Sequence, residues 1–195
     1  GPLPGRILAG FVHAVGDTVP LAGNRMRVAE PEIAFRFAVD LPPQAAPRGV
    51  DEVLAAVASV HPAFEVPDSR LADFARAGEA QLLADDACCG RFVFGAAAPE
   101  GWRQVDLATL AVHATVTGAD GKPRLAREGG GQAVLGDPRV ALTWLVNALS
   151  AQGLALRAGD TVSTGTCMVP LAIEPGDQVQ ADYGPLGRLD LRLAG

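Results

Sequence analysis

The stretch VAEPEIAFRF at residues 28–37 constrains this chain most, because its acidic and apolar residues fall on alternating positions. In an extended strand, successive side chains point to opposite faces of the sheet. Glu30 and Glu32 therefore share one face. The other face carries the apolar residues Ile33, Phe35 and Phe37. A strand with one strongly apolar face is held in a fixed register, so the two carboxylates are not free to move apart.

Two carboxylates held this close raise each other's pKa or require a cation between them. A third carboxylate, Glu65, lies in PAFEVPDSR at residues 62–70, an apolar run that can form a neighbouring strand. Three oxygen ligands without a nearby His or Cys suit a hard divalent cation, Mg2+ or Mn2+. The spacing alone leaves open the alternative that the glutamates lie on a solvated strand face.

Composition narrows the classes of partner. A chain of 195 residues with 49% hydrophobic content is long enough for one domain with a buried core. Its net charge is −6 and its 16 basic residues form no basic run, so nucleic acid is not expected as a partner. No apolar stretch is long enough to span a bilayer and no signal-peptide pattern opens the chain, so we expect a soluble protein without a membrane partner.

The three cysteines, Cys88, Cys89 and Cys167, match neither a disulfide framework nor a zinc-ligand spacing. This pattern favours a reduced, cytoplasmic protein.

Short alternating segments separated by turn residues predict many strands. They lie at residues 11–15 and 18–21 (a hairpin), 64–66, 92–94, 107–116 and 123–126 (a second hairpin), 160–166, and in the tail after residue 168. The stretch EGGG at residues 128–131 is interpreted as a flexible approach to a helix.

Two helices stand out among these strands. Helical spacing predicts one that opens at Asp51 and ends at His61 and Pro62. The clearest helix has Asp137 as its N-cap and ends at Gly153. Many short strands with few helices predict an α+β fold, a β-rich rolled mixed sheet with one long helix packed against it.

The motifs EPEIAF (residues 30–35), DLP (residues 40–42) and FEVPDSR (residues 64–70) resemble the 2-keto-4-pentenoate hydratase and 4-oxalocrotonate decarboxylase family of the fumarylacetoacetate hydrolase superfamily. The resemblance continues to the end of the chain. It implies the rolled C-terminal-domain fold of that superfamily. It also implies that Glu30, Glu32 and Glu65 hold a catalytic Mg2+ or Mn2+.

Two further segments are candidates for the site. Residues 160–166 form a strand that runs into a turn at Gly165, where free backbone amides can bind a carboxylate. The matching family segment contacts substrate, so the resemblance implies that role for Thr164, Gly165 and Thr166. In the loop before residue 91, the family often carries Asn and Ser where this chain has Asp86 and Cys88. Asp86 is the candidate catalytic residue, because proton transfer needs a positioned acid or base.

The resemblance implies a metal-dependent hydratase acting on a small anionic 2-hydroxydienoate or 2-oxo-4-enoate acid. The alternatives are a 4-oxalocrotonate-type decarboxylase or a catalytically reduced metal-binding partner subunit, and a carbon–carbon hydrolase also remains open. Family members carry a lysine and an acidic residue in an N-terminal region that has no match here, so residues 1–195 are expected to be a single catalytic domain without that region. A homo-oligomer is expected, with a partner enzyme of the same pathway as a further candidate.

Overall fold

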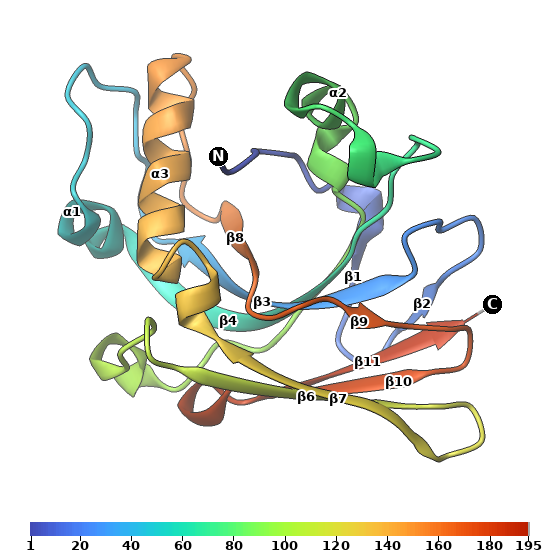
Figure 1. The fold of residues 1–195 in the computed structure, drawn as a ribbon. Helices are drawn as coiled ribbons and strands as arrows, with labels where there is room; N and C mark the ends of the chain where they lie inside the picture. Colours follow the sequence, from blue (N-terminus) through green and yellow to red (C-terminus); the bar gives the residue numbers. More distant parts are fainter. Residues whose placement is uncertain (195) are drawn as a thin grey trace.

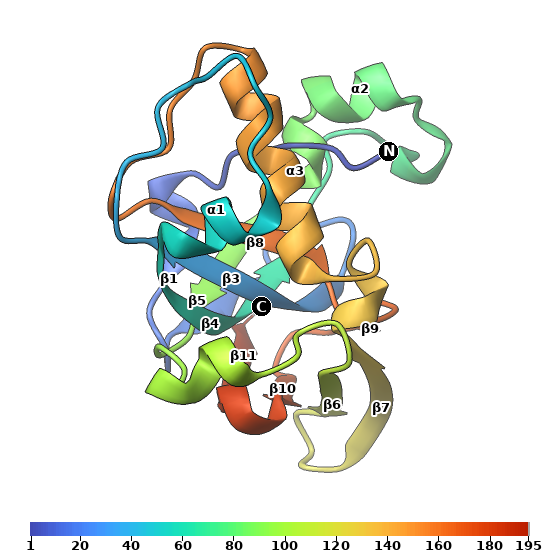
Figure 2. The same cartoon turned by 90° about the vertical axis from the view of Figure 1, so that its left-hand side faces the viewer.

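Two mixed β-sheets stack on each other in the computed structural model, which describes residues 1–194. Figures 1 and 2 show the helices α2 and α3 on the outer side of one sheet and the second sheet on its other side. The first sheet has the strand order β1-β5-β4-β3-β8, with β9 paired to β3, and the second has the order β2-β11-β10-β6-β7. The predicted α+β roll is thus confirmed, with its strands divided between two sheets.

The strands of the first sheet are β1 (Val12–His13), β3 (Val28–Phe37), β4 (Val57–Val66), β5 (Arg91–Phe94), β8 (Thr161–Thr166) and β9 (Leu171–Ala172). Those of the second are β2 (Thr18–Pro20), β6 (Ala111–Thr117), β7 (Pro123–Gly130), β10 (Gln178–Asp182) and β11 (Arg188–Ala194). The α-helices are α1 (Val50–Ala55), α2 (Glu79–Ala84) and α3 (Pro138–Ala151). Short 3-10 helices cover Ala9–Phe11, Phe74–Arg76, Asp86–Cys88, Glu100–Gln104, Gly131–Ala133 and Gly184–Leu186.

The main core lies between the two sheets. Ile33 and Phe35 on β3 and Phe64 on β4 are fully buried there, as the alternation of residues 28–37 predicts. Tyr183 ties the layers together, since its buried hydroxyl donates a hydrogen bond to the carbonyl of Ala63 at 2.6 Å. Burial of one face of β3 leaves its other face, which carries the glutamates, toward the side of α2 and α3.

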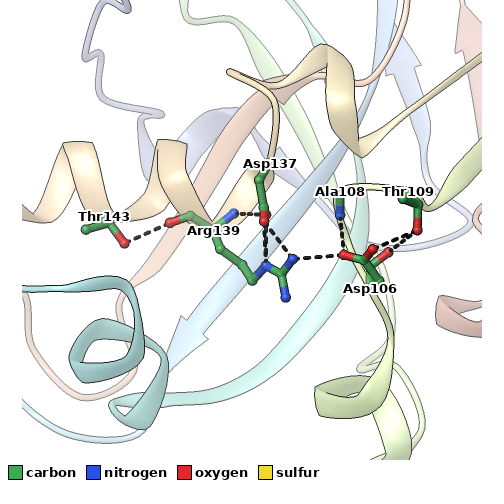
Figure 3. Close-up of polar contacts among 6 residues, drawn as sticks. All are labelled: Asp106, Ala108, Thr109, Asp137, Arg139 and Thr143. Carbon is green, nitrogen blue, oxygen red and sulfur yellow. Dashed lines mark hydrogen bonds and ion pairs between the residues drawn. The ribbon is translucent and has the colours of Figure 1, made fainter.

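Helix α3 begins as the sequence predicts. The side chain of Asp137 caps it by accepting a hydrogen bond from the backbone N–H of Arg139 at 2.8 Å, and Pro138 fills the first helical position. Figure 3 shows how the Arg139 guanidinium also bridges Asp137 to Asp106, which holds the loop before β6 against the helix. Thr109 donates a further hydrogen bond to Asp106. The long helix is therefore fixed at its base by a local ion-pair network.

The structure corrects three sequence-based predictions. The helix opened at Asp51 ends at Ala55, and Val57 and Val60 belong to β4 instead. The backbone hydrogen bonds of this segment are made with residues 30–37 of β3. This pairing overrides the short helical pattern. The expected hairpin at residues 11–21 does not form, because β1 pairs with β5 and β2 pairs with β11 in the other sheet. The glycines expected to be a flexible approach, Gly129 and Gly130, are paired in β7.

No helix in residues 1–194 has the length and apolar character needed to cross a membrane.

Candidate metal centre

The antiparallel pairing of β3 and β4 assembles the three carboxylates. Glu30 lies directly opposite Glu65, and Glu32 follows two residues along on the same face. One carboxylate oxygen from each of the three residues lies within 4.8 Å of the others. The predicted convergence of Glu30, Glu32 and Glu65 is therefore present, while their role as metal ligands stays a prediction.

Glu32 is the most buried of the three, at 1% exposed. The neighbouring strand β8 supplies its hydrogen bonds: the hydroxyl of Ser163 donates to Oε2, and the backbone of Gly165 also donates to the carboxylate. A register shift between β3 and β8 at this point allows both donors to reach one side chain. These contacts fix the direction of the Glu32 carboxylate.

Glu65 is oriented by the loop before β5, the strand that pairs with β4 on the side away from β3. Its Oε1 accepts the backbone N–H of Gly90 at 3.0 Å. A Cβ at residue 90 would lie 2.1 Å from the carbonyl oxygen of Val66, so only glycine allows this close approach. The glycine thus brings a backbone donor to the acidic cluster.

Burial makes all three carboxyl groups harder to ionise, and repulsion adds to the effect for Glu32 and Glu65. Burial raises the pKa of Glu30 to about 7. Burial also raises the pKa of Glu65 to about 7, with repulsion from Glu30 and Asp86 opposed by the Gly90 hydrogen bond. For Glu32, burial and then the charge of Glu65 raise the pKa well above its ordinary value. Such a cluster gains from a bound cation, which offsets both the burial and the repulsion.

A small apolar cluster borders the carboxylates on the same face. Ala63 lies opposite Glu32 in the register and forms a buried cluster with Ala34 and Phe92, against which Ile7 and Phe94 pack. This cluster is separate from the main core between the sheets. A ligand held at the carboxylates would therefore have an apolar surface beside it.

The loop that carries Asp86 is held by a second network. The hydroxyl of Ser69 and the guanidinium of Arg70 both donate to buried Asp85, and the hydrogen bond from Ser69 lowers the pKa of Asp85. Asp86 follows in the left-handed region (φ 57°), and its Oδ1 accepts the backbone N–H of Arg6 at 2.8 Å. The negative charge of Asp86 helps to raise the pKa of Glu65, but Asp86 is not one of the three converging carboxylates.

The predicted substrate segment lies beside the same cluster. Thr166 is opposite Glu32 in the register, and Gly165 has φ 98°. Both threonine hydroxyls donate to backbone carbonyls: Thr164 to Ile33 at 2.9 Å and Thr166 to Met168 at 2.9 Å. Each hydroxyl oxygen can accept a further hydrogen bond, and the substrate role of the segment stays a prediction.

Sequence reasoning missed Ser163 and Gly90 as parts of the site. Ser163 stands in the same strand as the predicted segment, but only the register shift reveals that it faces Glu32. The sequence pattern predicts that His61 lies at a helix end, but the structure places it in β4, where it is buried. It bonds to the Ser59 hydroxyl at 2.7 Å and to the carbonyl of Gly95 at 2.9 Å.

Taken together, the two-sheet roll and the converging carboxylates define a β-rich α+β protein with a candidate site for a divalent cation. The chain belongs to the fumarylacetoacetate (FAA) hydrolase family, whose C-terminal-domain profile matches residues 11–194. The resemblance stated from the sequence motifs is thereby confirmed.

Relatives within the family include two hydratases. The chain is 36% identical to the 2-hydroxyhexa-2,4-dienoate hydratase of Comamonas testosteroni over 85% of its own length and 59% of the relative. It is 32% identical to the 2-keto-4-pentenoate hydratase of Paraburkholderia xenovorans over 88% and 60%. The chain thus spans about 60% of the length of the hydratases it matches.

A solved structure with the same fold is the 4-oxalocrotonate decarboxylase of Pseudomonas putida G7, complexed with magnesium and adipate. It superposes with a TM-score of 0.81 at 29% identity, covering 94% of this chain and 66% of that one.

Proposed function

We propose that residues 1–195 form the metal-binding catalytic domain of a hydratase acting on a small anionic 2-hydroxydienoate or 2-oxo-4-enoate acid. The observation that carries the proposal is the convergence of Glu30, Glu32 and Glu65 within 4.8 Å on one sheet face. Similarity to two hydratases over more than four fifths of the chain supports the substrate class.

The donor set fits the proposed cation. Three carboxylates from adjacent strands suit Mg2+ or Mn2+, which prefer oxygen ligands. The magnesium in the similar decarboxylase structure supports the same choice. When bound, the cation would supply Lewis-acid polarisation of the substrate carboxylate and its adjacent oxygen.

The chain's own residues have distinct tasks in this proposal. Ser163 and Gly165 hold Glu32, and Gly90 holds Glu65, so that the carboxylates present a fixed charge. The apolar cluster around Phe92 takes the hydrocarbon part of the substrate and keeps water from it. The backbone at Gly165 and the hydroxyl of Thr166 orient the polar end of the substrate.

Asp86 is the proposed proton-transfer residue. Its negative charge acts on Glu65, and its loop is positioned by the Asp85 network. A carboxylate in this position can exchange a proton with a reacting carbon or with water.

A decarboxylase of the 4-oxalocrotonate type is the second candidate. The TM-score of 0.81 to such an enzyme is the observation that favours it. Both reactions need a cation that stabilises charge developing at the oxygen next to the substrate carboxylate, so the metal site does not distinguish them. A catalytically reduced metal-binding subunit is the third reading.

Calorimetric titration with Mg2+ and Mn2+, followed by parallel assays of 2-hydroxydienoate hydration and 4-oxalocrotonate decarboxylation, tests these readings. Glu32→Gln should lose metal binding, while Glu128→Gln on the exposed surface of β7 is the matched control. Hydration above decarboxylation supports the hydratase. The reverse order supports the decarboxylase, and metal binding without either turnover supports the reduced subunit. Equal metal affinity in wild type and Glu32→Gln contradicts all three.

We further propose a cytoplasmic homo-oligomer, with a partner enzyme of the same pathway as a candidate for association. The free cysteines Cys88, Cys89 and Cys167 support a reducing compartment. Light scattering after size exclusion measures the oligomeric state.

A further inference from the structure

We propose that a pocket on the far side of Gly90 from the acidic cluster binds a small organic or inorganic anion, such as a carboxylate or a phosphate. This inference does not depend on the proposed function, because the pocket shares no charged side chain with the candidate metal centre.

The pocket has a volume of about 150 Å³ and lies where β4 ends and β5 begins. Val66 and Arg91, which are paired there, both line it. Because strand residues alternate, their side chains lie on the opposite face from Glu65. The backbone of Gly90 is the wall between the two sites, with its N–H donated to Glu65. The pocket is therefore a separate site that opens away from the carboxylates.

Two arginines, Arg70 and Arg91, line the pocket. Arg91 is held over the ring of Phe11, with its guanidinium carbon 5.2 Å from the ring centroid. Arg70 is anchored by its Nε, which donates to Asp85 at 2.6 Å. A third arginine, Arg25, reaches the pocket margin by donating from its guanidinium to the carbonyl of Arg70 at 2.9 Å. Two arginines thus line the pocket and a third lies next to one of them, in a protein whose net charge is −6.

The polar groups around these arginines are already engaged. The Asn24 amide donates to the carbonyl of Pro67, and the Ser69 hydroxyl donates to Asp85. Asp68 accepts the backbone N–H of Arg25 at 2.7 Å. Within residues 1–194, Arg91 has one long side-chain contact, to His13 at 3.4 Å, and both terminal nitrogens of Arg70 lack a protein acceptor. The donors left for a ligand are therefore guanidinium N–H groups.

Charge and size together define the ligand class. Guanidinium groups pair best with carboxylate and phosphate oxygens, which they contact in a bidentate geometry. Arg25, Arg70 and Arg91 carry three positive charges and Asp68 and Asp85 two negative ones, so one positive charge is left over, and buried Asp85 already compensates Arg70. The volume is below that of sites for drug-sized ligands, which begin at about 300 Å³. A compact anion whose oxygens contact Arg91 and Arg70 together fits both limits.

Calorimetric titration with succinate and with inorganic phosphate tests the proposal. The protein is kept free of metal with a chelator, so that anions cannot bind through a cation at the carboxylates. Acetate serves as the single-charge comparison. Arg91→Gln and Arg25→Gln are each expected to weaken anion binding about tenfold, since each removes a charged hydrogen-bond donor. Arg192→Gln, an exposed arginine on β11 in the other sheet, is the matched control and should bind as wild type does.

Amide chemical shifts in a parallel titration locate the ligand. The proposal requires shifts at Arg70, Gly90 and Arg91 that saturate with the calorimetric affinity. Tighter binding of succinate identifies a dicarboxylate site, and tighter binding of phosphate identifies a phosphate site. Absence of saturable binding, equal affinity in all three variants, or shifts confined to Ser163 and Gly165 would overturn it. Arg25→Gln keeps the test valid if Arg91→Gln does not fold, because Arg25 lies outside the sheet.

Discussion

Glu30 on β3 and Glu65 on β4 are directly opposed in an antiparallel pair, so two partly buried carboxylates face each other across adjacent strands. Like charges opposite each other destabilise a sheet. The pairing is nevertheless the centre of the fold, because Ile33, Phe35 and Phe64 on the reverse face are fully buried. The core therefore holds the carboxylates together, and the cluster is poised to take up protons or a cation.

The first prediction concerns pH. Folding raises the pKa of Glu30 and of Glu65 from 4.5 to about 7 in the metal-free protein. Between these values the folded state binds more protons than the unfolded state, so the free energy of unfolding falls as the pH rises. We expect the metal-free protein to be more stable at pH 5 than at pH 8, about the two ends of this window. Urea unfolding at a series of pH values measures the slope.

Saturating Mg2+ provides the control for the pH series. Bound metal favours the ionised carboxylates, so the fall in stability should shrink or vanish with metal present. Metal affinity itself should rise as the pH passes through about 7, because protons compete for the same oxygens. A metal-free stability that rises from pH 5 to pH 8 would contradict the assignment.

Ser163→Ala removes the hydroxyl that donates to Glu32. The carboxylate loses a partner that lowers its pKa, and its orientation becomes less fixed. We expect Mg2+ affinity to fall about 10- to 100-fold, as for partners of metal ligands in other sites. Calorimetric titration measures the change, and Thr161→Ala, an exposed hydroxyl in the same strand, is the control. If both variants bind alike, Ser163 has no part in shaping the site.

Local sequence predicts the shared face of Glu30 and Glu32, whereas their convergence with Glu65 is what the family resemblance implies. Acidic and apolar residues alternate along residues 28–37. Spacing alone therefore predicts a strand with both glutamates on one of its faces. Asp137 and Pro138 likewise define the start of α3 within two positions. These features depend on neighbours in sequence, and they were identified correctly.

Features that depend on distant pairing escaped prediction. Val57 and Val60 have helical spacing, but β3 offers a complete row of hydrogen-bond partners, which decides in favour of a strand. The segments at residues 11–21 look like a hairpin, yet each finds a parallel partner in a different sheet. The contact of Ser163 with Glu32 requires a register shift that no local pattern encodes. Such choices are settled by tertiary packing.

Gly90→Ala is predicted to disturb both stability and the acidic cluster. The added Cβ would lie 2.1 Å from the carbonyl oxygen of Val66 and 2.9 Å from Cα of Pro67, which are backbone atoms that cannot swing aside. Overpacking of this kind costs about 1 to 3 kcal/mol. The shift also moves the N–H away from Glu65, so metal affinity should fall with stability. Thermal unfolding and metal titration measure the two effects.

Gly101→Ala is the matched control for this substitution, because no atom lies within 4 Å of its added Cβ. It should change neither quantity. A Gly90→Ala variant that keeps wild-type stability and metal affinity would contradict the prediction, because it would show that the backbone at residue 90 can accommodate a Cβ.

Asp137→Ala tests the base of α3. It removes the N-cap acceptor and one of the two carboxylates around Arg139. We expect a loss of about 1 kcal/mol in the free energy of unfolding, the usual value for an N-cap. Asp137→Asn keeps a capping oxygen and should recover most of it. Denaturant unfolding measures these free energies. If Asp137→Asn is as unstable as Asp137→Ala, the loss comes from the ion pair with Arg139 and not from the N-cap.

The last prediction concerns Asp86 as the proton-transfer residue. Asp86→Asn keeps the shape of the side chain and the acceptor for the N–H of Arg6, but it removes the titratable carboxyl group. Loss of one general acid or base lowers kcat by about 10²- to 10⁴-fold. Metal affinity should change far less than kcat, because Asp86 acts on Glu65 through its charge and is not among the three converging carboxylates. Steady-state assays at saturating Mg2+ separate the two quantities. His61→Asn serves as the comparison, since His61 is buried and bonded to Ser59 and Gly95. A kcat unchanged in Asp86→Asn but lost in His61→Asn would move the proton-transfer role to β4.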